Sequence, residues 1–247
     1  MNNLVFAAVE AACAAGQAIM EVYAHSFEVY TKEDASPVTQ ADLRASNIIK
    51  EMLLPTGLPF VSEEDLPPDR SGFGRYWLVD PLDGTAEFVK RNGEFTVNIA
   101  LIENKKPVLG VIYAPVTDQL WRSDTIPQIP PCKRPFTVLV SRSHRTPEVD
   151  GYIDKVLRPQ HPDLVIDSQG SSLKFARLVE GTADVYVCYS KTKEWDTAAA
   201  DAILTAAGGK VLRISDGKPL EATPPSDEKM EKLRDLMASY GLNVTIH

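Results

Sequence analysis

Apolar residues recur at helical spacing along the first 23 residues of the chain. The positions on this repeating face are Leu4, Ala8, Ala12, Ala15, Ile19 and Tyr23. This period predicts a long amphipathic helix with one face on the core. Glu10 and Glu21 interrupt the stretch and no basic segment precedes it, so we interpret it as part of the folded protein rather than a signal peptide. We expect no transmembrane segment in the chain.

Short strands dominate the pattern that follows, up to a proline-rich stretch at 125–135. The predicted elements are a strand and turn at 27–38, a helix from about 39 to 53, and strands at 59–61, 76–79 and 119–122. Two further strands lie between 95 and 115 and are joined by a turn at Asn104-Lys105-Lys106. The two strands between 95 and 115 and the strand at 119–122 follow one another with short connections, so they predict an antiparallel meander.

Beyond the proline-rich stretch, strands and helices alternate. Strands are predicted at 136–140, 164–167, 184–188 and 210–214, and helices at 147–157, 171–181, 197–207 and 226–239. A meander followed by alternating elements favours layers of helices and sheets over a doubly wound sheet. We expect residues 1–247 to form a single unit, with sub-halves 1–130 and 131–247 on either side of the proline-rich stretch.

Charge and cysteine content narrow the possible functions. The net charge is −8 and no basic run is present, which argues against binding to DNA or RNA polymers but allows a small anionic ligand. The cysteines, Cys13, Cys132 and Cys188, are scattered and odd in number, as expected for inert thiols in a reducing compartment. We therefore expect a cytoplasmic protein. The amphipathic first helix is also compatible with peripheral association with the cytoplasmic face of the inner membrane.

Acidic residues gather where predicted strands end and helices begin. They are Asp42, Glu63, Glu64, Asp80, Asp83 and Asp196. Two of them belong to one short run, Asp80-Pro81-Leu82-Asp83-Gly84-Thr85, in which Gly-Thr can turn the chain into a helix. Carboxylate oxygens are the ligands that Mg²⁺ prefers, and Mg²⁺ usually keeps water and substrate phosphate in its shell. No histidine or cysteine cluster offers a competing zinc site.

Each acidic residue also has a purely structural interpretation. Asp42 with Thr39 fits a capping box, and Asp196 can serve as the N-cap of the following helix. The stretch at 63–65 resembles a solvated loop, and Asp83-Gly84 is a common turn. Taken together, and above all in the six-residue run, the pattern favours a metal and phosphate site.

Several motifs resemble those of a known enzyme family. DPLDGT, an upstream SEE and a downstream WDTAAADAIL resemble the inositol monophosphatase superfamily of Mg²⁺-dependent, lithium-sensitive phosphatases. VTQAD, VSEED, NGEFTVNIALI, GVIYAPV, SRSH and GSSLK look like the 3′(2′),5′-bisphosphate nucleotidases of the CysQ type. These segments run in order from about residue 30 to 210. The resemblance implies an α+β fold, the layered αβαβα sandwich of the sugar phosphatases (inositol monophosphatase and fructose-1,6-bisphosphatase).

The resemblance also implies roles for individual residues. The positions that match metal ligands are Glu63, Asp80, the main-chain carbonyl of Leu82, Asp83 and Asp196, with Asp80 bridging two ions. Gly84 and Thr85 match positions that hold the scissile phosphate through backbone N–H groups. Asp42 and Thr85 match positions that orient and deprotonate the attacking water.

Nucleotide contacts are implied at positions in the second half of the chain. They are Ser141, His144, Gly170 and Lys174. A nucleotide with two phosphates needs a cationic pocket for the phosphate that is not cleaved. Besides Lys174 and His144, the candidates are Arg142, Lys191 and Lys193.

The implied activity is a Mg²⁺-dependent nucleotidase that converts adenosine 3′,5′-bisphosphate into AMP and phosphate. 3′-Phosphoadenylyl sulfate is a further candidate substrate, and the implied setting is sulfate assimilation. Two or three Mg²⁺ ions are expected, with Mn²⁺ able to substitute, Li⁺ inhibitory, and a monomer or homodimer as the assembly. The alternatives are an inositol monophosphatase or fructose-1,6-bisphosphatase, and a catalytically silent protein that binds metal or nucleotide.

Overall fold

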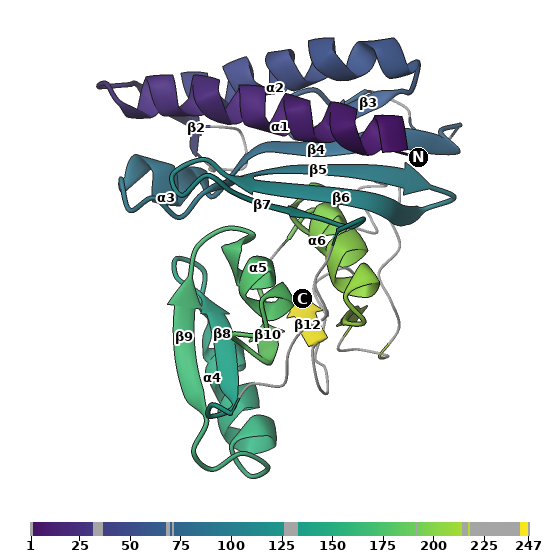
Figure 1. Ribbon diagram of the computed structural model, residues 1–247. Helices are drawn as coiled ribbons and strands as arrows, with labels where there is room; N and C mark the ends of the chain where they lie inside the picture. The colour runs from purple at the N-terminus through teal and green to yellow at the C-terminus, as the bar shows by residue number, and fades with distance from the viewer. Residues whose placement is uncertain are drawn as a thin grey trace.

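The computed structural model describes residues 2–31, 37–67, 70, 72–125, 133–190, 192–213, 217 and 243–246. In this part of the chain, layers of helix and sheet alternate in the order α, β, α, β, α (Figure 1). Helices α1 (Asn2–Tyr23) and α2 (Gln40–Leu53) form one outer layer, and α4 (Pro147–Tyr152) lies on the opposite side. The expected αβαβα sandwich is confirmed.

The first sheet contains the strands of the predicted meander. Its order is β3-β4-β5-β6-β7, with bounds Phe60–Ser62, Arg75–Asp83, Thr96–Glu103, Lys106–Ala114 and Gln119–Arg122. The pairs β5–β6 and β6–β7 are antiparallel, as predicted. The pair β4–β5 is also antiparallel, whereas β3 lies parallel to β4. A separate two-stranded ribbon, β1 (Val29–Thr31) with β2 (Pro37–Thr39), precedes α2.

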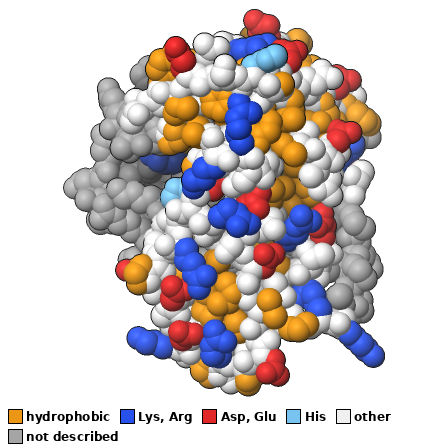
Figure 2. Space-filling view, turned by 90° about the vertical axis from the view of Figure 1, so that its left-hand side faces the viewer, with side chains coloured by type: hydrophobic (Ala, Val, Ile, Leu, Met, Phe, Trp, Pro, Cys, Tyr) orange, Lys and Arg blue, Asp and Glu red, His pale blue; other side chains and the backbone are white. Residues whose placement is uncertain are grey.

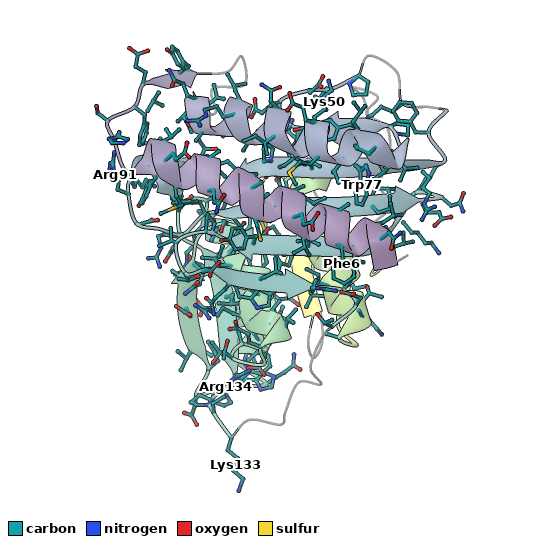
Figure 3. All side chains as sticks on the ribbon, turned by 45° about the horizontal axis from the view of Figure 1, so that its top comes forward. Phe6, Lys50, Trp77, Arg91, Lys133 and Arg134 are labelled. Atoms are coloured by element: carbon teal, nitrogen blue, oxygen red, sulfur yellow. The ribbon has the colours of Figure 1, made fainter. Side chains whose placement is uncertain are left out.

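Strand β4 is buried on both faces. Trp77 and Val79 point into the core under α1 and α2, while Tyr76 and Leu78 point into the core on the other side of the sheet. Figure 3 looks onto α1 and α2 lying across the sheet near Trp77. Because both faces are covered, this part of the strand is a continuous apolar run rather than an alternating one.

Helix α1 packs its small apolar residues against α2 and β6. Ala8, Ala12, Ala15 and Ile19, which form the predicted apolar face, are all buried. The stretch Asn3–Tyr23 is long and apolar enough to cross a membrane by length and composition, which we did not expect. However, 50% of an apolar 18-residue segment of this stretch is buried inside the protein. One face of α1 therefore packs in the core.

The second sheet is built from parallel pairs. Its order is β11-β12-β10-β8-β9, with bounds Lys210–Arg213, Asn243–Ile246, Val185–Val187, Thr137–Ser141 and Val165–Gln169. Helices α5 (Leu173–Val179) and α6 (Glu194–Ala206) lie between the two sheets (Figure 1). Helix α4 continues as a π-helical turn, Ile153–Leu157, and packs on the outer face of the second sheet.

Helix α6 lies unusually close to the first sheet. A Cβ atom placed on Gly110 of β6 would lie only 2.1 Å from the carbonyl oxygen of Ala199, so only glycine fits at this crossing. This contact fixes how far the start of α6 stands from the strands of the first sheet.

Two local predictions need correction. Strand β4 does not end at Val79 but continues to Asp83, with a shift of register between Asp80 and Asp83. Asp196 is not the N-cap of α6, because the helix begins at Glu194 and Asp196 is its third residue. The predicted helix at 226–239 and most of the proline-rich stretch, 126–132, lie outside the described residues.

Candidate functional site

Three carboxylates from separate segments meet at one end of the first sheet. Glu63 follows β3, Asp80 lies in β4, and Asp196 is in the first turn of α6. One carboxylate oxygen from each lies within 4.8 Å of those from the other two. Strands β3 and β4 are parallel neighbours in which Ser62 pairs with Val79. The residues that follow this pair, Glu63 and Asp80, therefore reach the same end of the sheet.

Burial and mutual repulsion make this cluster unfavourable without a cation. Burial raises the pKa of Asp80 well above its usual value, and the neighbouring charges of Glu63, Asp83 and Asp196 raise it further. The pKa of Asp196 is raised in the same way, first by burial and then by Asp83 and Glu63. A divalent cation with oxygen ligands would remove this repulsion, so the residues present fit Mg²⁺.

The turn after Asp80 arranges further oxygen atoms around the cluster. Oδ1 of Asp80 accepts a hydrogen bond from the N–H of Leu82 at 3.1 Å. The carbonyl of Leu82 lies 3.2 Å from the hydroxyl of Thr85. Gly84 has φ of 92°, a left-handed conformation that favours glycine, and Thr85 then begins α3 (Thr85–Val89). The run therefore turns within a few residues from strand to helix, as its sequence predicts.

Asp42 lies behind Thr85. Its Oδ1 accepts from the Thr85 hydroxyl at 3.0 Å. Its Oδ2 accepts from the N–H and the hydroxyl of Thr39, both at 2.8 Å, which completes the capping box of α2. Burial raises the pKa of Asp42, although the bonds from Thr39 and Thr85 work in the opposite direction. Asp42 therefore forms the predicted capping box and also contacts Thr85 in the cavity lining.

A cavity of about 240 Å³ opens over these groups. Most of the site residues expected from the sequence line it: Glu63, Asp80, Leu82, Asp83, Gly84, Thr85, Ser141, His144, Gly170, Lys174 and Asp196. Asp42 and the further candidate cations Arg142 and Lys193 are not among the lining residues. The first half of the chain supplies the acidic lining together with Asp196, and the second half supplies the remaining residues from the second sheet, its loops and helix α5. The sequence analysis therefore identified a set of residues that the fold brings together.

Lys174 is not the solvated helix lysine that its position in a short helix allows. Its side chain is buried, its Nζ donates to the carbonyl of Ser171, and it lies 5.1 Å from the centre of the Tyr186 ring. Burial lowers the pKa of Lys174. A buried ammonium group at the wall of a cavity is a strong attractor for an anion.

Arg142 has a different place from the one expected. Its guanidinium pairs with Glu94, including a 2.7 Å bond from Nη2 to Oε1, and the other oxygen of Glu94 accepts from the N–H of Gly170 at 2.7 Å. Arg142 is therefore engaged in joining two loops. Lys193 lies at the start of α6, where its N–H donates to Asp196 at 2.8 Å, and Lys191 lies outside the described residues.

The sequence analysis missed several polar residues in or directly behind the cavity lining. Asn98 and Ser172 contact Asp83, and the buried Glu87 accepts from the hydroxyl of Ser143. A signal for Asn98 is present in the sequence, because it interrupts the apolar run of β5 at a fully buried position.

Figure 2 shows one face of the molecule, on which Lys and Arg side chains are interspersed with Asp and Glu rather than forming a continuous basic stripe.

Comparison with known proteins identifies the family. Residues 1–240 match the sequence profile of the inositol monophosphatase family. The chain belongs to this family. As a member of the inositol monophosphatase family it is a phosphatase, and the resemblance found in its motifs is confirmed.

Relatives in the inositol monophosphatase family are similar over most of the chain. The chain is 46% identical over 228 residues to the 3′(2′),5′-bisphosphate nucleotidase CysQ of Escherichia coli O157:H7, covering 85% of this chain and 90% of the relative. It is 44% identical to CysQ of Salmonella typhimurium, covering 94% and 96%. The crystal structure of CysQ from Bacteroides thetaiotaomicron matches with a TM-score of 0.76 at 38% identity, covering 88% and 91%.

Proposed function

We propose that the chain is a Mg²⁺-dependent 3′(2′),5′-bisphosphate nucleotidase that removes the 3′-phosphate from adenosine 3′,5′-bisphosphate, leaving AMP. The observation that carries the proposal is the composition of the cavity, which is lined both by an acidic cluster and by the buried ammonium of Lys174. This arrangement suits a substrate with one phosphate on metal and a second phosphate on a cation. The CysQ relatives support the same substrate class.

The metal ligands in this proposal are Glu63, Asp80, the carbonyl of Leu82, Asp83 and Asp196, which together would hold two or three Mg²⁺ ions. When bound, such ions lower the pKa of a coordinated water and stabilise the leaving oxygen. Mn²⁺ would substitute, and Li⁺ would inhibit by occupying one position. The N–H groups of Gly84 and Thr85 would hold the scissile phosphate.

The chain's own residues supply the proton path. The hydroxyl of Thr85 already donates to Asp42 at 3.0 Å. As the attacking water loses a proton to Oγ1 of Thr85, the hydroxyl proton of Thr85 moves to Oδ1 of Asp42. Because burial raises the pKa of Asp42, this carboxylate is a better proton acceptor near neutral pH than an exposed one.

The nucleotide would be held by loops of the second sheet. Their residues in the cavity wall are Ser141, His144, Gly170 and Lys174. The N–H of His144 donates to the hydroxyl of Ser141 at 3.1 Å, which orders this loop. Lys174 would bind the phosphate that is not cleaved, and 3′-phosphoadenylyl sulfate would present a similar anion there. We propose a cytoplasmic enzyme of sulfate assimilation, formed by a single unit of two sub-halves.

The test is phosphate release by the purified protein with Mg²⁺. Adenosine 3′,5′-bisphosphate, inositol 1-phosphate and fructose 1,6-bisphosphate are compared in parallel, with Asp83→Asn as the blank. We expect a strong preference for the nucleotide and no turnover by Asp83→Asn. Preference for a sugar phosphate would overturn the nucleotide assignment and retain the metal site. No turnover of any substrate would favour a silent binding protein.

A further inference from the structure

A closed hydrogen-bond network surrounds one oxygen of Asp83. Oδ2 of Asp83 lies 2.6 Å from the hydroxyl of Ser172, 3.1 Å from Nδ2 of Asn98 and 3.5 Å from the hydroxyl of Thr96. The amide of Asn98 also donates to Oγ of Ser172 at 2.9 Å. The partners come from β5 and from the segment that precedes α5, so the network joins the two sub-halves.

The direction of each bond follows from the donors available. Nδ2 of Asn98 lies 3.1 Å from Oδ2 of Asp83 and 2.9 Å from Oγ of Ser172, and these two oxygens are only 2.6 Å apart, so one amide N–H of Asn98 points between them and is shared by both. A serine hydroxyl that accepts a bond from Asn98 still has its own proton to donate. The nearest acceptor for that proton is Asp83, because the carbonyl of Asp196 lies farther away, at 3.3 Å. The hydrogen-bond donors of the network therefore converge on a single carboxylate oxygen, Oδ2 of Asp83.

Asn98 is held in the orientation that this network requires. Its Oδ1 is buried and, among the described residues, has no hydrogen-bond donor. Turning the amide over would place that oxygen against the carboxylate of Asp83 and remove two bonds. An unpartnered buried carbonyl destabilises the fold, so the network retains this orientation at a cost in stability.

The segment that carries Ser172 is itself shaped for this contact. Ser171 has φ of 43°, in the left-handed region that non-glycine residues rarely adopt. A Cβ atom on Gly84 would lie 3.0 Å from Cβ of Ser171, so this segment packs directly on the turn after Asp83. Ser172 is almost fully buried and also lies 3.3 Å from the carbonyl of Asp196, in the first turn of α6.

We propose that Ser172 is a positioning residue of the metal site. Oriented by Asn98, it holds Oδ2 of Asp83 so that Oδ1 presents to a cation, and its hydroxyl oxygen packs beside the turn of α6 that carries Asp196. This inference rests on the proposed function, because it takes Asp83 to be a metal ligand. Groups that orient metal ligands typically change metal affinity by about 10–100-fold when removed.

The experiment measures Mn²⁺ binding by electron paramagnetic resonance for the full chain, alongside turnover of adenosine 3′,5′-bisphosphate over a range of Mg²⁺ concentrations. The variants are Ser172→Ala, Asn98→Ala, their double variant and Asp83→Asn. Ser123→Ala is the matched control, because its hydroxyl accepts from the N–H of Gly110, outside the cavity lining.

We expect Ser172→Ala to weaken Mn²⁺ binding by about 10-fold or more. High Mg²⁺ should restore most of its turnover at an assay temperature well below the Tm that the variant has in EDTA, where a loss of stability leaves the chain folded and cannot account for the rescue. The double variant should lose little more than either single variant, because both residues act through one network. Ser123→Ala should bind Mn²⁺ like the parent.

Failure of the inference differs from failure of the proposed function. If Asp83→Asn loses Mn²⁺ while Ser172→Ala binds it within twofold of the parent, the positioning role is wrong and the metal site stands. If Asp83→Asn binds Mn²⁺ like the parent, the metal assignment fails and the inference falls with it. Thermal melting of Ser172→Ala separates these results from misfolding, since a folded variant with weak Mn²⁺ binding supports the inference.

Discussion

The hydroxyl of Thr85 donates to Oδ1 of Asp42 at 3.0 Å, across 43 positions of the sequence. The other oxygen of Asp42 is occupied by the N–H and hydroxyl of Thr39. Oδ2 of Asp42 therefore completes the N-terminal cap of helix α2, and Oδ1 of the same carboxylate contacts Thr85 in the cavity lining. The cap fixes the orientation of the proposed proton acceptor, so no separate element is needed to aim it.

Replacing Asp42 by asparagine separates these two roles. The amide oxygen can still accept from Thr39, but an amide cannot take up a proton at neutral pH. We expect Asp42→Asn to lower kcat by about 10²–10⁴-fold with little change in KM or Tm. Thr85→Val should cause a similar loss, and the double variant should lose little more than either. Additive losses, measured by steady-state kinetics, would contradict a shared proton path.

Removing the charge of Asp80 should stabilise the metal-free protein. Burial and three neighbouring acids raise the pKa of Asp80, so its ionised form destabilises the fold. The stability linked to its protonated form is fully present below its usual pKa of 3.8 and is lost as pH rises through the raised value. At pH 7 in EDTA we therefore expect a higher Tm for Asp80→Asn than for the parent, by calorimetry.

The same two proteins should differ in how much Mg²⁺ raises their Tm. The parent should gain Tm with added Mg²⁺, by mass action on the folded state, whereas Asp80→Asn should gain little. The advantage of Asp80→Asn in EDTA should also shrink as the pH falls. If its Tm in EDTA is below that of the parent at pH 7, repulsion in the acidic cluster is not the dominant effect.

Lys174→Met removes the ammonium group from the cavity lining while keeping apolar contact with the ring of Tyr186. A bond to a charged group typically contributes about 1.5–3 kcal/mol, which is about 10–150-fold in affinity. We expect KM for adenosine 3′,5′-bisphosphate to rise by this factor, with less than about threefold change for 4-nitrophenyl phosphate, which lacks a second phosphate. Equal losses on both substrates would show that Lys174 supports the site without binding the nucleotide.

Li⁺ should inhibit turnover if the carboxylates hold more than one Mg²⁺ ion. A monovalent ion in one position would keep the oxygen ligands in place without activating water or stabilising the leaving oxygen as Mg²⁺ does. The expected result is inhibition by LiCl that an equal concentration of KCl does not produce. Identical effects of the two salts would indicate simple ionic-strength dependence and count against this arrangement of metal ions.

Gly110→Ala should disturb the site from a distance. The new methyl group would lie 2.1 Å from the carbonyl oxygen of Ala199 and force α6 away from β6. Overpacking of this kind typically costs about 1–3 kcal/mol, and each kcal/mol lowers Tm by about 2–4 °C for a chain of this size. Because α6 carries Asp196, Mn²⁺ affinity should fall as well.

Gly151→Ala is the matched control for that substitution. Gly151 lies in α4, and a Cβ atom there would contact nothing within 4 Å. Because alanine favours the helix over glycine, we expect stability to rise by about 0.5–1 kcal/mol with unchanged Mn²⁺ binding. Equal Tm values for Gly110→Ala and Gly151→Ala would contradict the close packing of α6 on β6.

The sequence identified the residues of the cavity better than it identified their surroundings. Motif resemblance placed Asp83 and Lys174 in the site, and both line the cavity. It did not show that Asn98 and Ser172 would meet at Asp83, since they lie 74 positions apart and meet only when the two sub-halves pack together. Periodicity is local, so it gives helices and strands but not the partners of a polar side chain across the core.

The same limit explains the misplaced cations. Arg142 follows a strand and is part of SRSH, so its sequence position suggests a cation for substrate phosphate. The structure instead pairs it with Glu94, which comes from the loop before β5. Lys174 was assigned to the site and lines the cavity, but its contact with Tyr186 of β10 could not be predicted, because helix α5 and that strand meet only in the folded chain.

Burial of β4 on both faces has a consequence for how the enzyme would fail on heating. Asp80 continues a strand whose neighbours Trp77, Leu78 and Val79 are fully enclosed, so it cannot move without opening the core. Loss of activity should therefore not precede loss of structure. Thermal inactivation and the far-UV circular dichroism transition should coincide. We expect no temperature range in which the chain is folded but the carboxylates of the cluster are separated.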